Sequence, residues 1–127
     1  MESMSSDNKR RTLETLQQIS NAIHQLRDWN ANVVDVDDFY RSQEGMMRLA
    51  ASSMLIEAIG EGVKKIDKLT NHHLRPLCPD IPWEDIIGMR NHIAHGYFDI
   101  DGELVLEVIK EELAPLEEAV NYLVSVL

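Results

Sequence analysis

The length, composition and charge of the chain limit what kind of protein it can be. It has 127 residues, 44% hydrophobic and 27% charged, which is typical of one soluble globular domain. It contains no apolar run long enough to span a membrane, and its polar start lacks the apolar core of a secretory signal. The net charge of −10 excludes broad binding to nucleic acid. We therefore expect any RNA contact to be confined to a local groove, or the acidic surface to face a basic protein partner.

The chain has a single cysteine, Cys78, and so cannot form an internal disulfide. This predicts residence in the cytoplasm. His72 and His73 lie close by in sequence, but no second cysteine or ligand pair follows them. We expect a loop thiol at Cys78 and no metal or cofactor in the protein.

The N-terminal third predicts one helix after a short tail. Residues 1–8 are polar and are expected to be disordered, so that residues 9–127 form a single helical domain. A helix from about Lys9 to Trp29 is predicted because apolar residues recur at steps of three or four. Those residues are Leu13, Leu16, Ile19, Ile23 and Leu26.

A second, longer helix is predicted from about Asp38 to Leu69. Its apolar residues, which include Met47 and Met54, are too many for one narrow stripe, which favours burial on two sides. Gly60 and Gly62 are costly inside a helix and indicate close helix packing.

The last third predicts a loop and then two more helical segments. Prolines at 76, 79 and 82 exclude helix, and Trp83 then begins a helix that ends near His95, with Trp83 in the core. A turn is expected at Asp101–Gly102, followed by a helical segment that Pro115 kinks or divides. No strand pattern competes, so the predicted fold is an all-α bundle of four or five helices.

Within residues 82–97 lie four side chains suited to chemistry: Arg90, Asn91, His95 and Tyr97. On an ideal helix Asn91 and His95 share a face, whereas Arg90 and His95 lie roughly 140° apart. One straight helix does not aim both at one small atom. Either the helix distorts at Gly96, or a second copy related by two-fold symmetry completes the site.

These residue types suit RNA cleavage without a metal. His95 can act as a base on the ribose 2′-hydroxyl or as an acid toward the leaving oxygen. The planar fork of Arg90 can clamp the phosphate, and Asn91 can position the phosphate or the imidazole. Tyr97 can bond the phosphate or stack on a base. His92 is expected to be a surface or supporting group. From spacing alone, a hydrogen-bonded helix end explains the segment at least as well.

Several segments together resemble the HEPN superfamily in its HepT-like branch. The spacing Arg90-x4-His95-x-Tyr97 is that of the family motif, and the segments MLIEAIGEGVKKI, PDIPWEDIIGMRN, DFY and FDID are similar to its pattern. This chain departs from it at Gly96 and Gly62. The resemblance implies a HEPN-type bundle that forms a homodimer, with a ribonuclease site of Arg90, Asn91 and His95. It also implies that Glu61, in the IGE segment, orients groups at the site.

The resemblance further implies a partner and a biological role. HepT-like proteins are usually paired, as toxins, with a nucleotidyltransferase antitoxin of the MntA kind. That enzyme transfers AMP to the motif tyrosine, here Tyr97. The expected substrate is RNA, with tRNA as one candidate, and not DNA; no membrane partner is expected.

Two other functions stay open from the residues alone. The chain could be a non-catalytic helical module that binds a nucleotidyltransferase through its acidic surface. It could also be a metalloenzyme that uses Glu57, Glu61 and a histidine, in which case activity would be sensitive to chelators.

Overall fold

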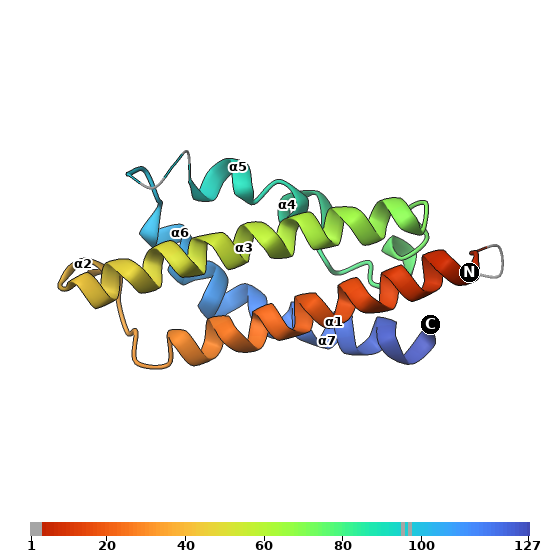
Figure 1. Cartoon of the computed structure of the whole chain (residues 1–127), viewed down its shortest axis with the longest axis horizontal. Helices are drawn as coiled ribbons and strands as arrows, with labels where there is room; N and C mark the ends of the chain where they lie inside the picture. The colour runs from red at the N-terminus through yellow and green to blue at the C-terminus, as the bar shows by residue number, and fades with distance from the viewer. Residues whose placement is uncertain (1–3, 95, 97) are drawn as a thin grey trace.

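The structure, a computed structural model, describes residues 4–94, 96 and 98–127, and the side chain of Arg90 lies outside that description. Its described part is an all-α bundle without a β-strand, as predicted, apart from one isolated bridge between Ala94 and Ile100 (Figure 1). The helical elements are α1 (Ser6–Trp29), α2 (Asp37–Tyr40), α3 (Gln43–Leu69), η1 (Arg75–Leu77), α4 (Trp83–Ile87), α5 (Arg90–Ile93), α6 (Gly102–Glu107), η2 (Val108–Glu112) and α7 (Leu113–Val126).

Helix α1 begins earlier than predicted. The hydroxyl of Ser5 accepts a hydrogen bond from the backbone N–H of Asn8 at 3.1 Å and caps the first turn. Residues 6–8 are therefore helical here, whereas the sequence predicted a disordered tail through residue 8. The helix ends at Trp29 as expected, and the predicted apolar stripe faces the core except for Leu13, which is only partly buried.

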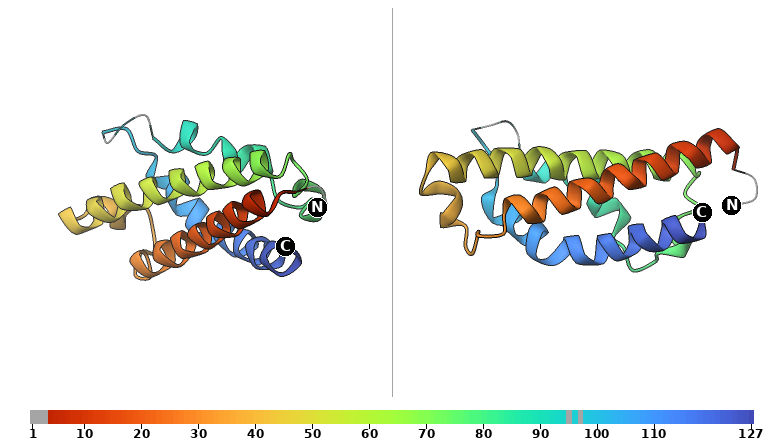
Figure 2. Two further views of the ribbon diagram at one scale, coloured as in Figure 1. Left: turned by 45° about the vertical axis from the view of Figure 1, so that its right-hand side comes forward. Right: turned by 60° about the horizontal axis from the view of Figure 1, so that its bottom comes forward.

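The long helices α1 and α3 run antiparallel and form the centre of the bundle, and α7 packs along α1 (Figures 1 and 2). At their contact, a Cβ on Gly62 would lie 2.9 Å from Cγ1 of Ile19. The absence of a side chain there lets the two helices approach closely, as the sequence predicted.

The predicted second helix is divided in two. Ser42 is extended, with φ −149° and ψ 162°, and its hydroxyl accepts the N–H of Gly45 at 3.0 Å, which starts α3 afresh after α2. A side chain at Gly45 would overlap the carbonyl oxygen of Asp38. The prediction that this helix is buried on two sides included too many residues, because Met47 and Met54 are each 71% exposed.

Helix α3 ends in a turn held by a buried carboxylate. Asp67 is 3% exposed and accepts from Nε of Arg75 at 3.0 Å and from its NH2 group at 2.7 Å; it also pairs with Nδ1 of His72 at 2.8 Å. The Arg75 guanidinium is the main reason that the pKa of Asp67 lies below its usual value. Asn71 and His72 have positive φ, 54° and 66°, as the chain reverses beneath this cluster.

The C-terminal segment differs from the prediction in its start. Asp101 is not part of a turn: its carboxylate accepts the N–H of Leu104 at 3.1 Å and caps α6 at Gly102. The π-helical turn η2 then joins α6 to α7. Pro115 has no N–H to donate to the preceding turn, but it lies in the first turn of α7, where a proline is tolerated. The helical segment therefore continues through Pro115. None of the helices in the described ranges has the length and hydropathy of a membrane span.

Candidate functional site

The motif segment is anchored on α3 through α4. The indole of Trp83 is buried, as predicted, and its N–H donates to the carbonyl oxygen of Cys78 at 3.0 Å. A Cβ on Gly60 would lie 2.9 Å from the carbonyl oxygen of Ile86, so the backbone of α4 rests directly on α3. Gly60 thus answers a packing need, and it sets how close the following motif comes to the bundle.

The motif helix is shorter than predicted. It breaks after α4 and resumes as α5, which ends at Ile93, and Ala94 is already extended, with φ −156° and ψ 144°. Ile93 is fully buried and holds the end of α5 against the core. The helix has therefore ended before His95. The prediction of one helix running to His95 was wrong, and the shared face and the 140° angle inferred from it do not apply.

The chain after α5 forms a loop whose two ends are joined by backbone contacts. The N–H of Asp101 donates to the carbonyl oxygen of Ile93 at 2.8 Å, and Ala94 and Ile100 form an antiparallel bridge. Within the loop, Gly96 has φ +137°, a conformation that side-chain-bearing residues rarely adopt. His95 and Tyr97 belong in sequence to this closed segment but lie outside the described residues.

The remaining predicted site residues lie on two packed helices. Arg90 and Asn91 are neighbours on α5, and Asn91 is exposed, with its backbone N–H donating to Gly88 at 3.0 Å. Glu61 is exposed on α3, against which α5 packs. His92 is exposed on α5, as expected of a surface group.

A pocket of about 280 Å³ lies beside α5 and was not predicted. Its floor is apolar, and its rim carries Glu84, Asp85, Glu107, Glu112 and His92. These residues come from α4, α5, α6 and η2, whose association no local sequence pattern reveals. The pocket combines an apolar surface with a negatively charged edge.

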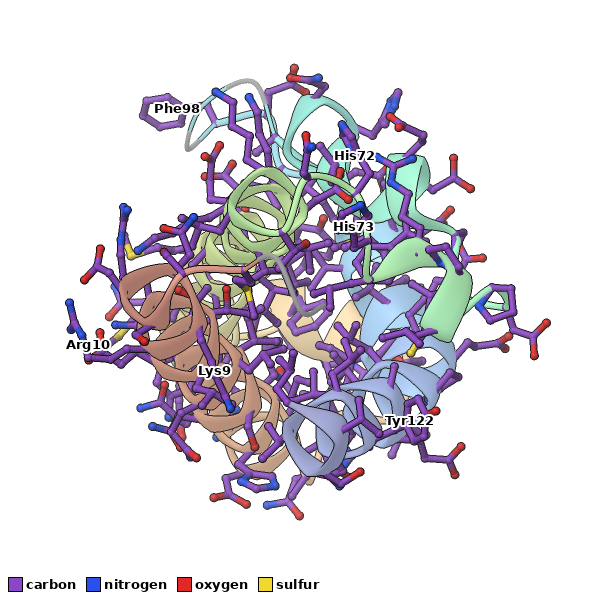
Figure 3. The ribbon with its side chains drawn as sticks, turned by 90° about the vertical axis from the view of Figure 1, so that its right-hand side faces the viewer. Lys9, Arg10, His72, His73, Phe98 and Tyr122 are labelled. Atoms are coloured by element: carbon purple, nitrogen blue, oxygen red, sulfur yellow. The ribbon has the colours of Figure 1, made fainter. Side chains whose placement is uncertain are left out.

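Sequence reasoning also passed over Phe98, which follows Tyr97 directly. Its ring is 98% exposed and projects from the closed loop (Figure 3). Its position between the predicted helices, outside any helical apolar stripe, could have indicated that this ring is exposed. An exposed ring there presents a flat apolar face beside the motif.

The described residues contain no group of three or more histidine, cysteine or acidic side chains that could hold a metal ion. Cys78 is buried, and this burial raises the pKa of its thiol.

Comparison with known proteins places this bundle and its motif in a class. Residues 19–123 match the family described as ribonuclease HepT-like. A candidate RNase of Methanocaldococcus jannaschii is 32% identical over 88 residues, covering 69% of this chain and 74% of that protein. A Thermococcus cleftensis protein named "Probable ribonuclease HepT" is 26% identical over 109 residues, 86% of this chain and 92% of that protein. No solved structure matches.

The all-α bundle and the family match together place the chain among ribonucleases of the HepT-like kind. The chain belongs to the HepT-like ribonuclease family, which confirms the resemblance seen in its sequence.

Proposed function

We propose that this protein is a metal-independent endoribonuclease that acts in the cytoplasm as the toxin of a toxin–antitoxin pair. The family match across residues 19–123, with the complete motif inside it, is the observation that carries the proposal. Arg90 and Asn91 are the first two residues of α5, which packs on the bundle. His95 follows in sequence, between Ala94 and Ile100, whose backbones form a bridge.

The proposed reaction uses only groups of the chain and of the RNA. One base removes the proton from the ribose 2′-hydroxyl, and its oxygen attacks the adjacent phosphorus. The bond from phosphorus to the 5′-oxygen breaks, and an acid donates a proton to that oxygen, which balances the proton taken by the base. His95 serves as the base or the acid, Arg90 clamps the phosphoryl oxygens, and Asn91 positions them. Because the attacking group is the 2′-hydroxyl, DNA is not a substrate. RNA cleavage in the presence of EDTA, with His95→Ala as the matched variant, tests the proposal.

We expect the protein to be a homodimer in which the two Arg90–His95 segments meet, as the sequence predicts. Exposed methionines on α3 offer an apolar face for pairing. Met47 and Met54 lie seven residues apart on α3, on one face of that helix, and both are 71% exposed in the single chain. Pairing two copies through this face would remove them from water. Sedimentation equilibrium at micromolar concentration should give twice the chain mass. A double change of Met47 and Met54 to Lys should yield monomer, whereas finding only monomer for the unaltered protein would contradict the dimer.

The proposed partner is a nucleotidyltransferase antitoxin, expected to present a basic, partly apolar surface. The pocket beside α5 supports this, because its apolar floor and acidic rim match such a surface in both hydrophobicity and charge. The same pocket favours the second candidate function, a non-catalytic module that binds this partner. The two functions differ in whether the purified protein cuts RNA on its own.

Adenylylation of Tyr97 is proposed as the switch that silences the ribonuclease. The added phosphodiester would place negative charge two residues from His95, where it can occupy the phosphate clamp at Arg90 and repel RNA. Tyr97→Phe should keep the fold, lose the modification and escape covalent inhibition. Mass spectrometry of protein co-produced with its partner checks this: AMP-sized additions should map to Tyr97 and vanish in the variant. Additions at another residue would refute the switch.

A further inference from the structure

Positive charge is gathered at one end of this acidic protein. Seven of its 12 lysines and arginines fall within the two short segments 9–11 and 64–75. The first segment belongs to the beginning of α1 and the second to the end of α3 and the turn after it. These segments are far apart in sequence, so the fold decides whether their charges act together.

The antiparallel packing of α1 and α3 brings both segments to the same end of the bundle. The side-chain amide of Asn8 donates to the carbonyl oxygen of Leu69 at 3.4 Å, which ties the first turn of α1 to the last turn of α3. Figure 3 looks onto this end, where Lys9 from α1 and His72 and His73 from the turn after α3 are visible.

Most of these cations are not neutralised by neighbouring carboxylates. Arg10 pairs with Asp7 and Glu14, and Arg75 pairs with Asp67 and Glu84. Five others are exposed and have no carboxylate within ion-pair distance in the part of the chain that the structure describes. These five, which we call the cationic end, are Lys9, Arg11, Lys64, Lys65 and Lys68.

Helix stability does not explain this arrangement. Lys68 lies in the last turn of α3, where the helix dipole favours a cation. Lys9 and Arg11, however, lie in the second turn of α1, beyond the first turn where a helix dipole acts most strongly, so the dipole does not favour them. The five like charges also repel one another. A ligand with many negative charges would relieve that repulsion.

A groove between α1 and α3 continues from the cationic end. It has a volume of about 430 Å³ and is lined by uncharged residues, including the amide side chains of Gln18, Asn21 and Gln25. Arg11 lies one turn before Thr15, and Lys65 one turn after Gly62, at the end of this lining. Its lining, among the described residues, contains no carboxylate, although the chain has 22 acidic residues.

We infer that the cationic end is a second RNA-binding surface, which holds the phosphate backbone of the substrate at a distance from the motif. This rests on the proposed ribonuclease function and adds to it a substrate class: RNA long enough, or folded enough, to touch both places. Lys68 is already about 12 Å along α3 from Gly60, where α4 contacts that helix. RNA that touches both places must therefore extend beyond the nucleotides held at the motif.

Three double variants with the same change in net charge test the inference. Lys64→Gln with Lys68→Gln, and Lys9→Gln with Arg11→Gln, each remove two charges from one helix of the cationic end. Asn32→Asp with Gln43→Glu lowers the net charge by the same amount at the opposite end of α1 and α3, on exposed positions. All three are made in the His95→Ala background, so that the RNA is not cut.

Binding is measured against a fluorescein-labelled single-stranded RNA of about 30 nucleotides, longer than one typical single-strand site. Each variant of the cationic end should reduce the slope of log K against log salt by about 1.4, which corresponds to a Kd about 25-fold higher at 0.1 M salt. The control variant should keep the slope of the parent. Circular dichroism should show the same helix content for all three.

Equal weakening by all three variants would mean that only net charge matters and would overturn the inference. An unchanged slope in both variants of the cationic end would overturn it too. If the unaltered protein still cleaves RNA in either case, the ribonuclease proposal survives. If it neither binds nor cleaves RNA, both proposals fail.

Kinetics in the chain that retains His95 give a second readout. For the long RNA, the variants of the cationic end should raise KM and leave kcat unchanged, because the removed charges do not touch the reacting phosphate. For an oligonucleotide of about four residues, KM should be unaffected. A fall in kcat with KM unchanged would contradict a remote binding surface.

Discussion

RNA cleavage by the His95→Ala variant should be lower than that of the unaltered protein by about 10²- to 10⁴-fold, the usual contribution of a general acid or base. His95 carries the proton transfer in the proposed mechanism, and histidine is the side chain that most often acts as acid or base near neutral pH. The measurement is the rate of appearance of cut RNA under single-turnover conditions, with EDTA present throughout.

His92→Ala is the matched control for this experiment. It removes the same side chain from an exposed position on α5, three residues earlier, and should leave cleavage close to that of the unaltered protein. An equal loss in both variants would point to damage to the segment and not to chemistry at His95. Cleavage that EDTA abolishes and Mg²⁺ restores would contradict the metal-independent mechanism.

Asp67→Asn should lower the free energy of unfolding by about 2–3 kcal/mol at pH 7. Removing one partner of a buried ion pair commonly costs 3–5 kcal/mol, because the other charge is left without compensation. The lower figure applies here because Arg75 is 29% exposed and keeps its contact with Glu84 at 2.8 Å, so water can partly rehydrate it. Urea denaturation measures the loss, and Asp80→Asn, at an exposed position of the following loop, should change stability by less than about 0.5 kcal/mol.

The same variant predicts a dependence on pH with a definite sign. The pKa of Asp67 is lowered in the folded protein, mainly by the hydrogen bonds from Arg75, so its stabilisation is complete above about pH 4, the ordinary range of an unfolded aspartate. It is lost as the pH falls through the folded-state pKa. The difference between the unaltered protein and Asp67→Asn should therefore shrink as the pH falls from about 4 into stronger acid. A difference that grows in acid would contradict this assignment.

The fold was predictable because its main signals are local. The apolar stripe of α1 repeats within a few residues, and the small residues Gly60 and Gly62 mark close contacts that the structure contains. The boundaries were less predictable where a single side chain decides them. The hydroxyl of Ser42 restarts the helix after α2, and the carboxylate of Asp101 turns an expected loop into a helix start.

The sequence motif names candidate site residues but does not give their geometry. The motif spacing singles out Arg90 and His95 as candidates. The early end of α5 depends on the burial of Ile93 and on the bridge from Ala94 to Ile100, contacts between distant parts of the chain that a local periodic pattern does not contain. The roles of Arg90, Asn91, His95, Tyr97 and Glu61 stay predictions. The acidic-rimmed pocket and the cationic end arise from helices that meet only after folding.

The contact at Gly60 has a consequence for protein engineering. Because the carbonyl oxygen of Ile86 occupies the space that a side chain at position 60 would need, residues 82–97 do not form a portable cassette. On another helical scaffold, these residues would need a glycine on the helix against which they pack. The unit that can be transferred is the motif segment together with one glycine on the helix that it packs against. A scaffold without a glycine at that position would hold the segment too far from its own surface.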